Sequence, residues 1–147
     1  MRIARACAML ADVATRPLAP NVFATAPLRL IGGRQRMTGQ LVFPLPADPD
    51  HYDPVDLPSR GSLWSYTVQR FPPKSPPYRG PEPFVPYAVG YVELPGALIV
   101  ESLLTRVDFG SLKVGLPMEL TTLPLRTDPD GSTVIGYAFQ PLQGRAP

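Results

Sequence analysis

The chain has 147 residues, 44% of them hydrophobic, and a formal net charge of +2, so we expect one domain with its own core. Its 21 prolines exclude long helices from most of the sequence, because proline breaks helices. The small net charge disfavours a nonspecific nucleic-acid binder, and no apolar stretch approaches the roughly 18 residues that a membrane span needs.

Residues 1–27 are expected to form an N-terminal arm. Apolar side chains recur at a helical spacing from Ile3 to Ala14, which favours a short helix over residues 2–14. Prolines at positions 17 and 20 would end that helix. We expect the arm or helix to pack on the domain or on a partner.

Residues 28–56 are predicted to form a β-hairpin followed by a linker. Leu28–Ile31 and Gln40–Phe43 are short β-like runs, and the glycine-rich sequence GGRQRMTG lies between them. Residues 46–60 contain four prolines and four aspartates without any periodicity. We therefore expect a linker or an irregular loop there.

The remainder of the chain predicts a β-barrel. Five strand-like runs occur after residue 60, and we expect them to be antiparallel. In the first of them, Leu63, Ser65 and Thr67 alternate with Trp64, Tyr66 and Val68. A small closed barrel removes the edges that short strands leave exposed, so we predict a mainly β protein with a five-stranded OB-fold over residues 57–142 and a tail over 143–147. The predicted strands are residues 61–69, 87–94, 98–104, 117–125 and 133–140.

The segment between the first two barrel strands is the best candidate for a binding surface. Residues 71–86 contain seven prolines, which favour extended polyproline geometry and reduce the entropy lost on docking. Cationic and aromatic side chains interleave there, which fits a nucleotide, a protein interface, or a solvated loop whose rings pack on the barrel. The candidate contact residues are Arg70, Phe71, Lys74, Tyr78, Arg79, Phe84 and Tyr87.

No pattern in the sequence predicts catalysis or a metal site. Structural zinc needs four ligands in two pairs, and the single cysteine and single histidine, Cys7 and His51, lie far apart in the sequence. The segment around Asp48, Asp50 and Asp53 lacks the glycine turn and distal glutamate of a calcium loop. No nucleophile–base pair is evident, so we expect no catalytic residue and no bound cofactor. One cysteine allows no internal disulfide, which suits a cytoplasmic protein.

Several spaced blocks resemble the domain-of-unknown-function family 35. They are GSLWSYTV at 61–68, PFVPYAVGYVEL at 83–94, the glycines and apolar residues of 110–118, and YAFQP at 137–141. Members of that family join a rubredoxin-like zinc ribbon to an OB-fold and accompany thiolase-like enzymes, aldolases or hydratases as non-catalytic subunits. The resemblance implies an accessory subunit in a hetero-oligomer, which stabilises a thiolase-like partner and borders its CoA or acyl site. The alternative is an OB-fold that binds single-stranded nucleic acid.

The same resemblance extends to residues 28–44. They are similar to the first half of the zinc ribbon, with Gln35 and Thr38 at the positions of the cysteines. The second pair would fall within residues 47–55, which contain no cysteine. The resemblance thus implies a ribbon that has kept its hairpin and lost its metal, with apolar packing in place of zinc. The apolar candidates are Leu30, Ile31, Leu41, Val42 and Phe43.

Overall fold

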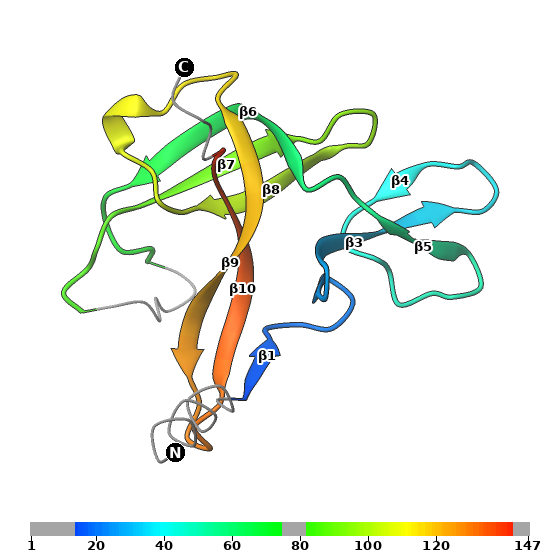
Figure 1. Ribbon diagram of the computed structural model, residues 1–147, viewed down its shortest axis with the longest axis horizontal. Helices are drawn as coiled ribbons and strands as arrows, with labels where there is room; N and C mark the ends of the chain where they lie inside the picture. The colour runs from blue at the N-terminus through cyan, green and yellow to red at the C-terminus, as the bar shows by residue number, and fades with distance from the viewer. Residues whose placement is uncertain (1–13, 75–81, 143–147) are drawn as a thin grey trace, which may run out of the picture.

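The computed structural model describes residues 14–74 and 82–142, which form a barrel and a smaller sheet beside it (Figure 1). The predicted helix over residues 2–14 lies, except for Ala14, outside the described residues. Within the described ranges, no helix has the length and apolar character needed to cross a membrane. The strands are β1 (Thr15–Pro17), β2 (Phe23–Thr25), β3 (Leu28–Gln35), β4 (Leu41–Val42), β5 (Tyr52–Asp56), β6 (Arg60–Gln69), β7 (Tyr87–Glu93), β8 (Ile99–Leu104), β9 (Pro117–Thr127) and β10 (Thr133–Pro141), with a short 3-10 turn, η1, at Phe109–Ser111.

The barrel is a closed sheet of five strands, as the sequence predicts for an OB-fold. Its order is β10-β8-β7-β6-β9, and β9 pairs back with β10. One expectation is wrong: β10 and β8 run parallel, with Ala138 beside Leu103 and Phe139 beside Leu104. A barrel with an odd number of strands cannot alternate direction all the way round, so closure requires one parallel pair. The barrel is therefore mixed.

The core lies inside the barrel because alternate residues of each strand point inward. Along β7 the side chains of Ala88 and Val92 are buried, while Tyr91 and Glu93 between and after them are exposed. Met118 of β9 and Phe139 of β10 are completely buried in the same core. The outer face of β7 is thus free to take part in a surface site.

A bulge in β6 interrupts the predicted alternation. Leu63 pairs with Val92 and Ser65 pairs with Tyr91, so Trp64 is an extra residue without a partner in β7. Such a bulge shifts the inward and outward positions by one residue. Leu63 and Val68 therefore both face the core, whereas simple alternation would place them on opposite faces.

The smaller sheet is built on β3, which pairs with β2, β4 and β5. The predicted hairpin exists, because Gly33 pairs with Val42 and Arg34 with Leu41. Its turn is shorter than expected, since Gly32 and Gly33 belong to β3. A Cβ atom at Gly32 would lie 2.9 Å from the carbonyl oxygen of Val42, so glycine here permits close packing of strands.

The expectation of an irregular linker over residues 46–60 is also wrong. Tyr52–Asp56 forms β5, an antiparallel neighbour of β3, with Pro54 beside Gly33. Pro54 is tolerated because β5 pairs only with β3 and lies at the edge of its sheet. Proline content alone was therefore a poor guide at this position.

The small sheet and the barrel share one apolar core. Leu30 of β3 is completely buried, and Phe23 and Leu57 are almost so, in the same cluster as the barrel residues. The rings of Phe23 and Phe43 both meet Tyr137 of β10 edge-on, at centroid distances of 6.3 and 5.6 Å. These contacts hold the small sheet against the barrel. Figure 1 shows the small sheet beside the barrel.

Candidate functional site

The predicted contact residues lie at the two ends of the β6–β7 connection. Arg70 lies with its guanidinium carbon 5.8 Å from the centre of the Phe109 ring, and Phe71 and Lys74 are exposed. At the other end, the rings of Phe84 and Tyr87 meet edge-on at 6.0 Å. Tyr78 and Arg79 lie outside the described residues. Among the described candidates, the structure thus shows one ring contact at each end of the connection, and a binding role for them stays a prediction.

An apolar groove, which the sequence did not predict, lies on the outer face of the barrel and has a volume of about 540 Å³. Its floor is formed by side chains of three neighbouring strands: Tyr87 and Val89 of β7, Leu103 of β8 and Tyr137 of β10. Its walls come from the chain before β3 and the chain after β4, through Leu18, Val22, Phe23, Phe43 and Pro44. The groove forms because the N-terminal segment and the small sheet stand over outward-facing positions of the barrel.

The polar groups of the groove are few. The Tyr137 hydroxyl donates a hydrogen bond to the carbonyl oxygen of Glu101 at 2.8 Å, and the Ser102 hydroxyl donates to the carbonyl oxygen of Leu103 at 2.8 Å. Burial, and then the nearby charge of Glu101, raise the pKa of Tyr137. The phenol is therefore neutral at physiological pH, and its one proton is already engaged.

A second hollow of about 500 Å³ continues from the groove, with Phe43, Pro44, Glu101 and Tyr137 common to both. It extends toward β4 and the start of β8, along residues 41–44 and 98–101. Glu101 thus lines both hollows. The apolar surface is longer than either hollow alone.

An exposed aromatic pair lies further along the outer face of the barrel. The rings of Trp64 and Tyr91 meet at a right angle, with centroids 6.4 Å apart, and are 53% and 43% exposed. Ile99, on β8, is also exposed, and its cross-strand partner Glu93 is exposed as well. Trp64 follows the inward-facing Leu63 and is the extra residue of the β6 bulge. Exposed tryptophan and tyrosine are typical anchors of protein interfaces.

Side-chain hydrogen bonds close the turn where the first ribbon cysteines would stand. The side-chain oxygen of Gln35 accepts hydrogen bonds from the amide and the hydroxyl of Thr38, at 2.7 and 3.2 Å. The Gly39 amide donates to the Gln35 carbonyl oxygen at 2.7 Å, and Gly39 has a φ of 73°, which glycine adopts readily. Gln35 and Thr38 therefore bridge the turn directly.

A second turn repeats this arrangement. Nδ1 of His51 lies 2.9 Å from the carboxylate of Asp48, and the Tyr52 amide donates to the Asp48 carbonyl oxygen at 3.1 Å. Asp48 and His51 have the same three-residue spacing as Gln35 and Thr38. They fall within residues 47–55, where the resemblance places the second cysteine pair.

Arg36 connects the two turns. Its guanidinium lies 2.9 Å from the Asp53 carboxylate and donates to the Asp50 carbonyl oxygen at 3.1 Å, while its amide donates to the His51 carbonyl oxygen at 2.9 Å. In the part of the chain that the structure describes, no three His, Cys, Asp or Glu side chains gather as metal ligands. That no zinc is bound stays a prediction, because it concerns the purified protein.

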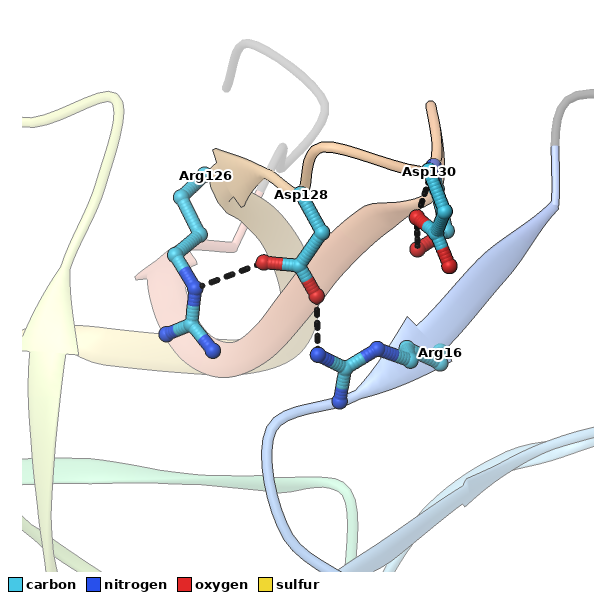
Figure 2. Close-up of polar contacts among 5 residues, drawn as sticks. Arg16, Arg126, Asp128 and Asp130 are labelled. Carbon is cyan, nitrogen blue, oxygen red and sulfur yellow. Dashed lines mark hydrogen bonds and ion pairs between the residues drawn. The ribbon is translucent and has the colours of Figure 1, made fainter.

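The charged groups of the β9–β10 turn have a structural role. Figure 2 shows Asp128 between Arg16 of β1 and Arg126 of β9. Hydrogen bonds from Arg16, which have the largest effect, and from Arg126 lower the pKa of Asp128. Hydrogen bonds from the hydroxyl and the amide of Ser132 lower the pKa of Asp130. Arg16 thereby ties β1 to the hairpin, alongside the parallel pairing of β1 with β10.

The chain is similar to known proteins along most of its length. A family model described as the C-terminal OB-fold domain of ChsH2 matches residues 54–123, from β5 into β9. A DUF35 domain-containing scaffold protein of Pyrococcus furiosus is 32% identical over 120 residues, which cover 78% of this chain and 84% of that protein. A solved structure of an Ltp2–ChsH2(DUF35) aldolase contains a chain with 27% identity and a TM-score of 0.57, over 77% of this chain and 84% of that one. The 32% identity to the scaffold protein, over most of both chains, shows common descent. The protein therefore belongs to the DUF35 family.

Proposed function

We propose that this chain is a non-catalytic scaffold subunit of a thiolase-like acyl-CoA enzyme. The observation that carries the proposal is its similarity, over 77% of its length, to a chain of the Ltp2–ChsH2(DUF35) aldolase. The relative from Pyrococcus furiosus is itself described as a scaffold protein. In this assignment the partner supplies the catalytic groups, and this chain stabilises it and borders its CoA or acyl site.

The described side chains are consistent with a supporting role. The one histidine of the chain, His51, is engaged with Asp48 on the small sheet, far in sequence from the groove residues of the barrel. The carboxylates of Glu93 and Glu101 lie on the outer face of β7 and β8, and within residues 14–74 and 82–142 neither forms an ion pair with a histidine, lysine or arginine. Such groups do not form a nucleophile–base pair, which covalent catalysis requires.

Two surfaces are candidates for the partner. One is the β6–β7 connection, with Arg70 and Phe71. The other is the outer barrel face around Trp64, Tyr91 and Ile99. We favour the barrel face, because a rigid sheet presents its anchors without the entropy cost of ordering a loop.

Co-expression tests the proposal. The tagged chain is produced with each thiolase-like enzyme of the source organism, and one of them should co-purify in a fixed ratio. The isolated chain should not turn over acyl-CoA, whereas the complex should. Turnover by the isolated chain, or failure of every such enzyme to bind, would contradict the scaffold assignment.

Two single substitutions then identify the surface. If the barrel face is the interface, Trp64→Ala should weaken the complex by about 2 kcal/mol or more, as for interface hot spots. Phe71→Ala, which removes an exposed ring from the loop, is the matched control and should change affinity little. The opposite ranking would assign the interface to the loop.

The exposed Trp64–Tyr91 pair also favours the second candidate, an OB-fold that binds single-stranded nucleic acid by stacking. Glu93 and Glu101 on the same face would repel phosphates, so we expect weak binding that falls steeply with salt. Titration of a fluorescent oligonucleotide at two salt concentrations distinguishes the cases. Tight binding that persists at high salt, and that Trp64→Ala abolishes, would favour the nucleic-acid function.

A further inference from the structure

The groove has the size and the lining of a small-molecule site. Its volume of about 540 Å³ lies within the roughly 300–1,000 Å³ of known ligand pockets and well above the ~150 Å³ cavity that holds benzene. Val89 and Leu103, on its floor, are only half-buried. A bound apolar group would remove them from water, which favours binding.

The charges around the groove decide which ligand it accepts. Among the described residues that line it, none is lysine, arginine or histidine, and Glu101 supplies the one carboxylate. A ligand carboxylate would lose hydration without gaining a cation and would be repelled by Glu101. The hydroxyl protons of Tyr137 and Ser102 are donated to backbone carbonyls, so they are not available to solvate an anion.

We propose that the groove binds the uncharged apolar part of a ligand and rejects free carboxylic acids. A thioester presents its acyl group without charge, whereas the free acid carries a carboxylate at neutral pH. The groove would thus hold an acyl group attached as a thioester and release it after hydrolysis. Only this last identification, of the ligand as an acyl thioester, rests on the scaffold function proposed above.

The binding test uses the isolated full-length chain and a neutral fluorescent probe, N-phenyl-1-naphthylamine. Its emission should rise and saturate as protein is added. Decanol should displace the probe, whereas decanoate should compete at least about tenfold more weakly, because burying its charge is costly. Glu101→Gln should narrow the difference in competition between decanol and decanoate, because it removes the charge that repels the carboxylate.

Substitutions that enlarge side chains lining the groove test whether the probe binds there. Val89→Phe enlarges a half-buried side chain of the floor, and Ala19→Leu enlarges one on the N-terminal wall, outside the strands. Each should reduce probe affinity about tenfold or more, since the added atoms occupy the ligand volume. Val114→Phe makes the same change at an exposed residue that does not line the groove, and it should bind as the parent does. Circular dichroism checks that each variant is folded.

Several outcomes would overturn the proposal. They are no saturable signal from folded protein, equal competition by decanol and decanoate, or unchanged binding in both groove-filling variants. Analytical ultracentrifugation tests a further alternative, that the groove is an interface between two copies of the chain. In that case the protein would be a dimer that does not bind the probe, and Val89→Phe would dissociate the dimer. Because the isolated chain is used, failure here leaves the scaffold proposal standing, and failure of complex formation leaves the groove proposal standing.

Discussion

At the scale of single residues, glycine is required where strands of the barrel come close. A Cβ atom at Gly90 would lie 2.8 Å from Cδ1 of Leu63 and 3.0 Å from Cδ1 of Leu104. Both leucines are buried in the core and cannot move aside easily. The backbone oxygen of Ser65, 3.1 Å away, closes the remaining direction.

Gly90→Ala is therefore expected to destabilise the protein by about 1–3 kcal/mol, the usual cost of overpacking a core. Urea denaturation measures the change in the free energy of unfolding. Gly110→Ala is the control, because a Cβ there would meet only the Asp108 carboxylate, at 3.9 Å. Equal stability of the two variants would contradict the packing described for β7.

The Asp128 carboxylate should make stability depend on pH. Its pKa is lowered below the ordinary 3.8 by hydrogen bonds from Arg16 and Arg126. A carboxyl group with a lowered folded-state pKa stabilises the protein above its unfolded-state pKa, and that contribution is lost as the pH falls through the folded-state pKa. Asp128→Asn should therefore lower the midpoint of thermal unfolding at neutral pH, with the difference from the parent shrinking below about pH 4.

Asp56→Asn is the control for that measurement, since it removes a more exposed carboxylate whose ion pair is with Arg29 on the small sheet. We expect this change to be small at every pH, as for most surface ion pairs. A constant difference between Asp128→Asn and the parent from neutral to acidic pH would mean that Asp128 stabilises the turn without its charge.

At the scale of elements, side-chain contacts close the two turns of the small sheet, where the resemblance to a zinc ribbon predicts the cysteine pairs. Gln35 bonds to Thr38 and Asp48 to His51, and Arg36 joins the turns. The turns are neighbours because Gln35 pairs with Tyr52 across β3 and β5. The sheet thus places the two turns next to each other, and their origin as a ribbon that has lost its zinc stays a prediction.

Restoring cysteines at those four positions should restore metal binding. The variant Gln35→Cys, Thr38→Cys, Asp48→Cys, His51→Cys should bind about one zinc per chain, because two Cys-x-x-Cys turns that face each other form a tetrahedral site. Elemental analysis measures the zinc, and the parent should hold none. The variant with cysteines only at 35 and 38 is the control, since two ligands bind zinc weakly. A four-cysteine variant that folds without zinc would show that the turns are not equivalent to a ribbon.

The β6–β7 connection can be tested as a removable element. β6 ends at Gln69 and β7 begins at Tyr87, and these two residues pair directly, so the ladder between the two strands is complete without the chain that connects them. Replacing residues 72–83 with a short glycine–serine linker should leave the unfolding midpoint nearly unchanged, because loops tolerate such changes. Partner binding should persist if the barrel face is the interface. Its loss in a folded variant would move the interface to the loop.

At the scale of the whole molecule, the barrel, the small sheet and the N-terminal segment produce together what none of them has alone. The groove takes its floor from β7, β8 and β10 and its walls from residues 18–23 and 43–44. β1 holds the N-terminal segment in place by pairing with β10. A surface built from parts so distant in the chain leaves no local pattern in the sequence.

The amino-acid sequence by itself determined the barrel strands, the hairpin of the small sheet and the family. Those features depend on local alternation, turn residues and spaced blocks such as residues 83–94, all of which are read along the chain. A binding role for the predicted loop residues stays a prediction, because exposed cations and rings do not by themselves reveal what they contact.

Tertiary structure alone decided the rest. β5 forms despite Pro54 because β3 offers it an edge, and Val68 faces the core because β6 carries a bulge that its pairing with β7 reveals. The parallel pairing of β10 with β8 follows from closing the barrel, and the groove follows from docking the small sheet over it. Each of these depends on contacts between residues far apart in sequence, whose energies no local pattern records.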